Sequence, residues 1–359
     1  VNRQNDQIPS DAGYVAIINS TNIRVEGLDL KNNYQGILIA YSNNTTIHQN
    51  NVTDNLYGIC FKFSFNNTVS ENNVTNNEWD GILLKESCNN NIYKNNITNP
   101  YRTGIMIDTS SNNTLSENNI ANNTIGISLY SSSSNIISGN NIMHNYDGIW
   151  IVSSISLASS NNMIYHNNFI NNTEQVGFWP ILGGENAWDN GYPSGGNYWS
   201  DYNGTDSYSG PYQNATGGDG IGDTPYVIDE QNQDRYPLIE PWKKVSGKLE
   251  ILEPANGSTI AGPVAITFTI ENTGDLIEFL QGDPSNRIDL EIEYRSTDGE
   301  TCGWGIMFWS TSHCGLTLGS REKYEQTLVY DPTEYEESVP PGFIGDAPYG
   351  QTTIRLVHW

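Results

Sequence analysis

The sequence has few basic residues and no long apolar segment. Its 16 Lys and Arg stand against 41 Asp and Glu, which gives a formal net charge of −25. We do not expect so acidic a chain, without a basic cluster, to bind nucleic acid. No apolar run is long enough to span a membrane, so no transmembrane segment is expected. No signal peptide is present, which we interpret as a mature or trimmed chain.

Helical periodicity is also missing. No segment repeats apolar residues with the i, i+3, i+4, i+7 spacing over three turns. Short apolar pieces alternate with period two instead, as at Ile37 and Ile39, and are followed by single apolar residues at Ile47 and Val52. β-branched residues between corners of Asn, Ser and Gly are typical of strands and turns. The sequence therefore predicts an all-β protein.

A unit of 22 or 23 residues recurs through the first half of the chain. The glycines that mark successive units are Gly36, Gly58, Gly81, Gly104, Gly126, Gly148 and Gly177, the last after a longer step. A fixed period of this length indicates a solenoid. Because each unit holds three short apolar pieces, we predict a three-sided parallel β-helix of about seven coils over residues 1–200.

An asparagine pair precedes the third apolar piece of every unit. The pairs are Asn50-Asn51, Asn72-Asn73, Asn95-Asn96, Asn118-Asn119, Asn140-Asn141 and Asn167-Asn168. Stacked coils would place these amides about 4.8 Å apart, so each could donate to the next and accept from the last. We also expect one Asn of each pair to take the left-handed conformation at the corner. A disordered tract would not need this constant phase.

The residue two places after each glycine is expected to point out of the coil. This row consists of Leu38, Cys60, Leu83, Met106, Ser128 and Trp150. It is largely apolar, which favours a contact surface, covered either by the C-terminal part of the chain or by a neighbouring molecule. No helix precedes the first coil, so we expect either a removed N-terminal segment or another subunit to cover its strand edges.

Cysteines are few, and N-x-S/T sequences are many, which together favour the outside of a cell. Cys302 and Cys314 are predicted to form a disulfide. Cys60 and Cys88 stand at different places in their units, about 16 Å apart along the strands, so we expect them to be free, buried or paired between molecules. Candidate glycosylation sites are Asn19, Asn43, Asn66, Asn112, Asn122, Asn171, Asn203, Asn214 and Asn256.

The composition changes after the repeats. Residues 201–244 form a closing segment with a Gly- and Asp-rich loop and a linker. Residues 245–359 contain alternating apolar segments separated by Asn-Gly and Gly-Pro turns, which predicts an Ig-like β-sandwich. Such a domain would serve in adhesion or subunit contact, or act as a passive spacer.

Three motifs in the closing segment carry a resemblance to a known family. They are GNYWSDY at Gly196–Tyr202, GDGIGDTPY at Gly218–Tyr226 and DRYPL at Asp234–Leu238. Together with the repeats, over residues 1 to about 242, they resemble NosD-type right-handed β-helix proteins, which are abundant among archaeal surface proteins. The resemblance implies a right-handed parallel β-helix.

The name-giving members of that family are periplasmic and linked to copper-site maturation, which raises the question of a copper site here. Copper needs His, Cys or Met ligands brought together. His48, His144 and His166 stand at different offsets from their asparagine pairs, so they are not expected to stack. We therefore do not expect copper as a cofactor.

Calcium is the cofactor that the closing segment favours. Asp219 and Asp223, with Asp206 or Asp201 nearby, offer hard carboxylate oxygens on a glycine-rich loop. The alternative is that these acids are ordinary surface residues of glycine turns, because the twelve-residue EF-hand loop is absent.

The sequence predicts an extracellular structural protein, not an enzyme, that assembles with copies of itself into a surface layer, sheath or filament, with surface glycans as further partners. The alternative is a carbohydrate-active β-helix protein, either a polysaccharide lyase or hydrolase or a binding protein. Such enzymes need carboxylates grouped with a basic residue on one exposed face. The outward acids are expected to be scattered by register, at Asp54, Glu71, Glu78 and Glu117, and Arg102 is the only arginine between Arg24 and Arg235.

Overall fold

The computed structural model describes residues 4–99, 101–154, 158–179 and 184–243, together with eight strands nearer the C-terminus. The chain divides into two compact units. One comprises Val1–Ala215 with Ile221–Trp242, and the other comprises Thr216–Gly220 with Lys243–Trp359. Among the described residues, no helix has the length and apolar character needed to cross a membrane.

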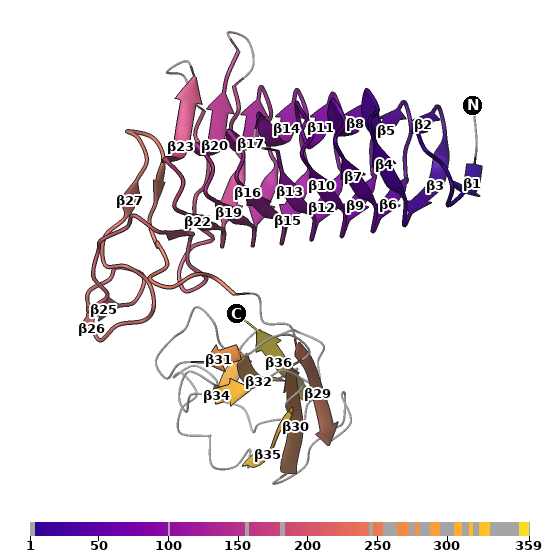
Figure 1. Ribbon diagram of the computed structural model, residues 1–359. Helices are drawn as coiled ribbons and strands as arrows, with labels where there is room; N and C mark the ends of the chain where they lie inside the picture. The colour runs from indigo at the N-terminus through magenta and orange to yellow at the C-terminus, as the bar shows by residue number, and fades with distance from the viewer. Residues whose placement is uncertain are drawn as a thin grey trace. The chain divides into compact units, whose positions relative to one another are not determined.

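The first unit is a parallel β-helix with three sheets of eight strands each (Figure 1). Sheet 1 comprises β1 (Gln4–Gln7), β3 (Thr21–Glu26), β6 (Thr46–His48), β9 (Thr68–Ser70), β12 (Asn91–Tyr93), β15 (Thr114–Ser116), β18 (Ile136–Ser138) and β21 (Met163–Tyr165). Sheet 2 comprises β4 (Asp29–Lys31), β7 (Asn51–Thr53), β10 (Asn73–Thr75), β13 (Asn96–Thr98), β16 (Asn119–Ala121), β19 (Asn141–Met143), β22 (Asn168–Ile170) and β24 (Tyr198–Trp199). Sheet 3 comprises β2 (Val15–Ile18), β5 (Gln35–Ala40), β8 (Tyr57–Lys62), β11 (Ile82–Lys85), β14 (Thr103–Asp108), β17 (Ile125–Tyr130), β20 (Asp147–Val152) and β23 (Glu174–Trp179).

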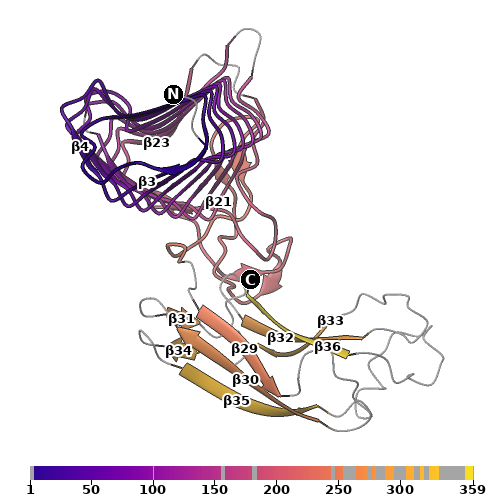
Figure 2. The ribbon, with the colours of Figure 1, turned by 90° about the vertical axis from the view of Figure 1, so that its right-hand side faces the viewer.

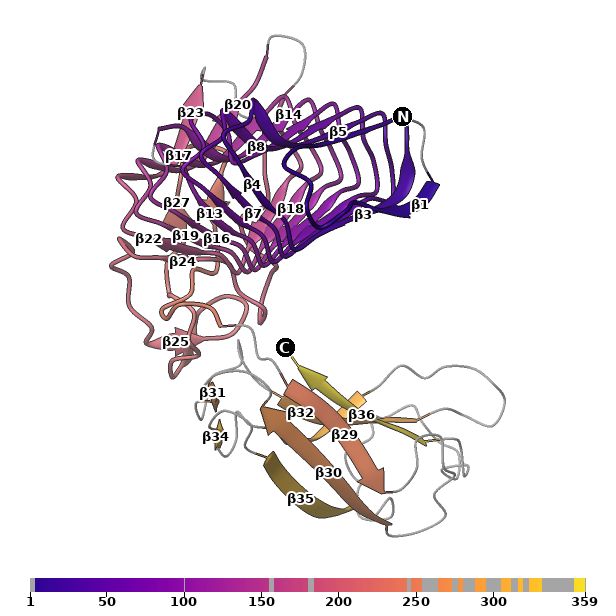
Figure 3. The ribbon, with the colours of Figure 1, turned by 45° about the vertical axis from the view of Figure 1, so that its right-hand side comes forward.

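Each coil contributes one strand to each sheet, and the coils lie nearly superimposed when the helix is seen along its axis (Figure 2). Figure 3 shows the same stack obliquely, with β5, β8, β14 and β20 following one another along one side. The all-β prediction and the parallel β-helix are thereby confirmed. The first coil is not bare on every side, because β1 pairs with β3 in sheet 1.

The interior is filled by short β-branched side chains in register. Ile37, Ile59, Ile82 and Ile105 follow one another in sheet 3 and are fully buried. The marker glycines are required by close packing at the adjacent corner. A Cβ atom at Gly58, for example, would overlap the carbonyl oxygen of Gly81 in the next coil. The repeat therefore follows from the space available inside the coil.

The predicted asparagine ladder is present. Asn118 is fully buried, and its Nδ2 donates to Oδ1 of Asn140 at 2.9 Å and to the carbonyl oxygen of Ile92 at 2.9 Å. The backbone N–H of Asn118 donates to the same Oδ1 at 3.0 Å. The same pattern joins Asn50, Asn72, Asn95, Asn118, Asn140, Asn167 and Asn197. Each amide thus satisfies buried backbone groups of its neighbours, which would otherwise be costly.

The left-handed corner lies one residue earlier than predicted. Positive φ angles occur at the residues before the asparagine pairs, such as Gln49 (53°), Glu71 (56°) and Lys94 (56°). The pair itself is not available for the turn, because its first Asn must point inward for the ladder and its second begins the next strand. The exposed residue before the pair therefore takes the left-handed conformation, which is uncommon for a residue other than Gly, Asn or Asp.

Two further asparagine ladders and one serine ladder line other corners. One runs through Asn55, Asn77, Asn99, Asn123, Asn145 and Asn172, another through Asn67, Asn90, Asn113, Asn135, Asn162 and Asn186, and the serines are Ser20, Ser42, Ser64, Ser87, Ser110, Ser132 and Ser159. Polar corners between all three sheets are therefore satisfied from within the stack.

The closing motifs end the predicted ladder. The backbone N–H of Asn197 donates to Oδ2 of the fully buried Asp234 at 2.7 Å, and Nε1 of Trp199 donates to the same oxygen at 2.9 Å. Trp199 also stacks on Phe169 of the last coil at 4.2 Å. Two small two-stranded sheets follow in the closing segment: β25 (Tyr208–Ser209) with β26 (Ala215–Thr216), and β27 (Tyr226–Val227) with β28 (Gln233–Asp234).

The second unit contains antiparallel strands. One sheet is formed by β29 (Gly247–Glu253), β30 (Val264–Asn272) and β35 (Lys323–Tyr330), a second by β31 (Ile277–Phe279) and β34 (Leu316–Leu318), and a third by β33 (Gly305–Ser310), β32 (Ile288–Tyr294) and β36 (Thr352–His358). The Ig-like sandwich stays a prediction. Cys302, Cys314 and Asn256 lie outside the described residues.

Replacing one buried asparagine of the ladder should lower the free energy of unfolding far more than replacing the asparagine that follows it. Asn118→Ala removes the acceptor of the Asn95 N–H and side-chain amide and the donor to Ile92, all buried. We expect a loss of about 3 kcal/mol or more in the free energy of unfolding. Asn119→Ala, the matched control, removes one exposed bond to Asn96 and should cost about 1 kcal/mol or less. Urea unfolding followed by circular dichroism measures both, and equal losses would refute the role of the ladder.

Candidate functional site

The outer face of sheet 3 carries the predicted outward row. Leu38, Cys60, Leu83, Met106, Ser128 and Trp150 are direct partners in consecutive strands. The row is not a continuous exposed stripe, because Cys60 and Ser128 are only 2% and 3% exposed and the others are half-buried. The longer side chains of Tyr57 and Lys62, which lie on either side of Cys60, line the same pocket as that thiol.

An aromatic rim borders this face on the side where the sheet 3 strands begin. Tyr34 and Tyr57 have ring centroids 5.9 Å apart, and Tyr57 and Trp79 have centroids 5.4 Å apart. The guanidinium of Arg102 lies 4.3 Å from the centroid of the Trp79 ring, which is a cation–π contact. Tyr34 is 64% and Trp79 41% exposed. Exposed aromatic faces therefore follow one another along three consecutive coils.

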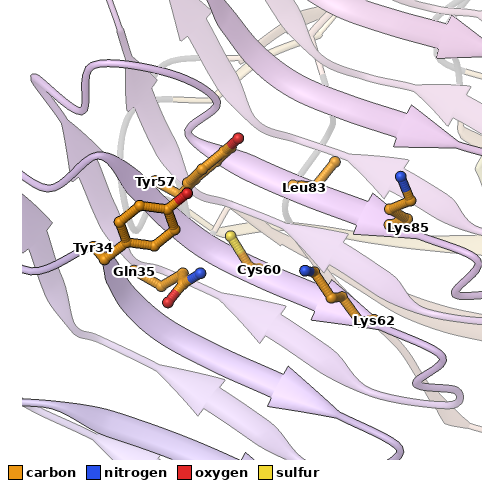
Figure 4. A pocket seen from close by; sticks show the side chains of 7 residues that line it. All are labelled: Tyr34, Gln35, Tyr57, Cys60, Lys62, Leu83 and Lys85. Carbon is orange, nitrogen blue, oxygen red and sulfur yellow. The ribbon is translucent and has the colours of Figure 1, made fainter.

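A pocket of about 160 Å³ lies beside the rim (Figure 4). Its lining residues are Tyr34, Gln35, Tyr57, Cys60, Lys62, Leu83 and Lys85. Figure 4 shows the two tyrosines on one side of Cys60 and Leu83 and the two lysines on the other. Its volume is of the order of the roughly 150 Å³ that hold one benzene-sized ring, and its lining is mixed, with Gln35, Lys62 and Lys85 beside apolar groups.

Titratable groups gather around the same coils. Asp80 is only 8% exposed, and this burial raises its pKa to about 6, while nearby Arg102 and a hydrogen bond from Thr103 oppose the shift. Lys85 forms an ion pair with Asp108 at 3.3 Å. Burial also raises the pKa of the Cys60 thiol, which keeps it protonated.

The expectation of scattered acids concerned Asp54, Glu71, Glu78 and Glu117, and the present group consists of other residues. Glu71 and Glu117 stand at the same left-handed corner two coils apart, and Asp54 stands at a different left-handed corner. Asp80 and Asp108, however, share the face of sheet 3 with Arg102 and Lys85. Tyr34, Trp79 and Arg102, whose role the sequence reasoning missed, each stand two places before a marker glycine, and Tyr57 and Asp80 stand one place before one. Alignment of the repeats at these positions is the signal that could have found them.

The four aspartates of the predicted calcium site differ in their contacts. Asp223 accepts hydrogen bonds from the backbone N–H groups of Ser207 and Tyr208 and from the Thr205 hydroxyl, at 2.9–3.2 Å. Asp201 accepts bonds from Gln175 and Tyr226. Asp206 is half-buried, and Asp219, which is buried, belongs to the short segment grouped with the second unit. Calcium binding stays a prediction.

Copper ligands do not come together in the described part of the chain. No group of three His, Cys, Asp or Glu side chains there is arranged to hold a metal ion. His48 contacts the Ser70 hydroxyl, His144 is exposed, and His166 stacks on Trp242 with its Nε2 2.6 Å from the carbonyl oxygen of Ser194. These histidines do not fit a shared copper site.

Cys60, Cys88 and most of the candidate glycosylation sites lie in the described part of the chain. Cys60 and Cys88 are both free thiols, and Sγ of Cys88 accepts a hydrogen bond from the Ser111 N–H at 3.2 Å. The described sequon residues are all exposed, namely Asn19, Asn43, Asn66, Asn112, Asn122, Asn171, Asn203 and Asn214. Attachment of sugar to them stays a prediction.

Comparison with known families places the repeat region. Residues 2–204 match the model of the family described as periplasmic copper-binding protein (NosD). The chain belongs to the NosD family. Its closing motifs, which carried the resemblance in the sequence, form the cap at Asn197, Trp199 and Asp234. No curated protein matches the chain. The archaeal branch of the family stays a prediction.

Solved structures similar to this NosD-family chain are β-helix proteins of low identity. A single-residue mutant of the periplasmic alginate epimerase AlgG is 21% identical, with a TM-score of 0.44 over 48% of this chain and 46% of that chain. The AlgE6 A-module, a mannuronan C-5 epimerase of Azotobacter vinelandii, is 13% identical, with a TM-score of 0.37 over 52% of this chain and 54% of that chain. An alginate lyase of Paenibacillus sp. str. FPU-7 is 10% identical, with a TM-score of 0.32 over 47% of this chain and 91% of that chain. The first two matches span about half of those proteins, and none of the three carries an argument about chemistry here.

Removing the Asp80 charge should change how stability depends on pH. Because the folded pKa of about 6 lies above the unfolded value, the wild-type chain loses stability as pH rises from about 4 through 6. Asp80→Asn should therefore raise the free energy of unfolding at pH 8 by up to about 3 kcal/mol and leave it unchanged at pH 4. Asp54→Asn, at an exposed corner, is the control. Thermal unfolding at both pH values tests this, and a gain at pH 4 as large as that at pH 8 would contradict it.

Proposed function

We propose that the outer face of sheet 3 binds a linear polysaccharide. The observation that carries this proposal is the aromatic rim of Tyr34, Tyr57 and Trp79 beside a pocket of about 160 Å³. Sugar rings present an apolar C–H face that packs on aromatic rings, and their hydroxyls need polar partners at the edge. Gln35 and the tyrosine hydroxyls supply such partners in the pocket.

The repeat of the protein fits the repeat of the ligand. Successive coils are about 4.8 Å apart, close to the length that one pyranose ring adds to an extended chain. A glycan lying parallel to the helix axis would therefore meet an equivalent position on every coil. The rim supplies aromatic faces on three consecutive coils, with Tyr57 one residue out of step with Tyr34 and Trp79. The central row from Leu38 to Trp150 supplies the floor.

This proposal follows the alternative drawn from the sequence more closely than its main prediction. Self-assembly into a layer, sheath or filament stays a prediction, and a glycan-binding face does not require it. We place the protein outside the cytoplasm, either extracellular or periplasmic, because a polysaccharide ligand would be found there and because the family description is periplasmic.

A second candidate function, catalysis on the bound glycan, is supported by the acid and base groups beside the rim. Asp80, with its raised pKa, lies near Arg102, and Tyr57 interacts with both Asp80 and Arg102. A carboxyl group whose pKa is close to neutral suits proton transfer, and an arginine suits stabilisation of developing negative charge. Whether the protein is an enzyme is decided by assay. Release of sugar fragments by wild type but not by Asp80→Asn, with binding retained, would establish it.

Removing the most prominent aromatic face should weaken glycan binding. Trp79→Ala is expected to lower affinity by about 10- to 100-fold, because it deletes a stacking surface of the rim and releases Arg102 from it. Tyr212→Ala is the control, since Tyr212 is 83% exposed in the closing segment and is not part of the rim. Affinity electrophoresis and calorimetry against a panel of linear polysaccharides measure the effect. Equal affinity of both variants for every glycan that binds wild type would refute the proposal.

A further inference from the structure

Basic side chains are scarce in the β-helix unit, and most have a carboxylate partner. Residues 4–242 contain seven Lys and Arg. Five of them form ion pairs: Arg24 with Glu26, Lys31 with Asp29, Lys85 with Asp108, Lys94 with Glu117 and Arg235 with Asp189. The other two, Lys62 and Arg102, form no ion pair with any described residue.

Both cations without a carboxylate partner lie on the sheet 3 face. Lys62 ends β8 and lines the pocket on the side opposite the tyrosines (Figure 4). Arg102 stands just before β14, over the ring of Trp79. They are therefore two coils apart, about 10 Å along the helix axis, and on opposite sides of the central row. Both side chains are exposed.

The nearby carboxylates do not neutralise these two charges at the surface. Asp108 is already paired with Lys85. Asp80 interacts electrostatically with Arg102 but is only 8% exposed, so the guanidinium remains accessible to a ligand. In a chain with a net charge of −25, two accessible cations on one face make a local exception to the surrounding field.

We propose that the glycan bound on the sheet 3 face is an acidic polysaccharide whose anionic groups pair with Lys62 and Arg102. This inference rests on the proposed function. A neutral glycan would need the aromatic rim but would have no use for the two cations. The negative charge of the rest of the protein is screened beyond about 10 Å at 0.1 M salt, so it does not prevent an anion from reaching Lys62 and Arg102 at contact distance.

The charge of the ligand can be tested on the wild-type protein alone. Calorimetry with the full chain at 0.1 M salt compares a linear polyuronate with the same polymer after its carboxyl groups are reduced to alcohols. We expect the polyuronate to bind at least about tenfold more tightly. A sulfated linear polysaccharide forms the third arm. Binding of the sulfated polymer without the polyuronate would identify sulfate as the anionic group, and binding of the polyuronate without it would identify carboxylate.

Substitution of the two cations tests the residues. The double variant Lys62→Gln/Arg102→Gln should lose about tenfold or more in affinity for the acidic polymer and should lose less for any neutral one. Lys94→Gln is the matched control, because Lys94 follows sheet 1 strand β12 and is paired with Glu117. It should stay within about twofold of wild type, as expected for an exposed ion pair away from the ligand. Unchanged thermal unfolding of both variants shows that they fold.

The outcomes separate the two proposals. Equal binding of the polyuronate and its reduced form, or equal loss in the Lys94→Gln control, overturns the acidic ligand while leaving glycan binding in place. Absence of binding to acidic, sulfated and neutral polymers alike overturns the proposed function itself, and this inference with it.

Discussion

Hydrogen bonds between buried side-chain amides of neighbouring coils are the interaction on which the structure depends. A rung such as Asn118 joins three coils, because it accepts from Asn95, donates to Asn140 and also bonds the backbone of Ile92. Extra residues must loop out between the ladder positions, as they do between Asn140 and Asn167, which are 27 residues apart and still bonded. The ladders therefore keep every outward residue in register with its counterparts in the neighbouring coils. Because of this register, single residues from different repeats come to lie side by side on one surface.

The fold could be predicted because its determinants repeat. The glycine spacing, the inward isoleucines and the asparagine pairs each recur with constant phase, so they reveal coil length, inward positions and one ladder. The ladders of Asn55 and Asn67 were missed because their asparagines are paired in some units, as at Asn76-Asn77, and not in others, as at Asn55 and Asn145. The position of the left-handed corner was misplaced because an Asn pair looks suited to a turn when its backbone bonds are not considered.

The site could not be predicted in the same way because its residues do not repeat. Tyr34, Trp79 and Arg102 occupy one position of the unit with different side chains, and only the stacked register brings them together. From the sequence alone Asp80 would be taken for an ordinary surface acid, because its burial appears only in the structure. Asp223 shows why the calcium prediction could not be narrowed from the sequence, since an acid on a glycine-rich loop suits a cation and equally suits the backbone N–H groups of Ser207 and Tyr208 that it accepts from.

The ladders also bear on chemical ageing. Asparagine deamidates when the backbone nitrogen of the following residue attacks the side-chain carbonyl carbon, and a chain so rich in Asn would be vulnerable in flexible form. At Asn118 the attacking nitrogen is held elsewhere, because the N–H of Asn119 donates to the carbonyl oxygen of Asn95 at 2.9 Å. The amide itself is locked by its neighbours and shielded from water. Stacking thus turns a chemically labile side chain into a durable one for as long as the coils remain closed.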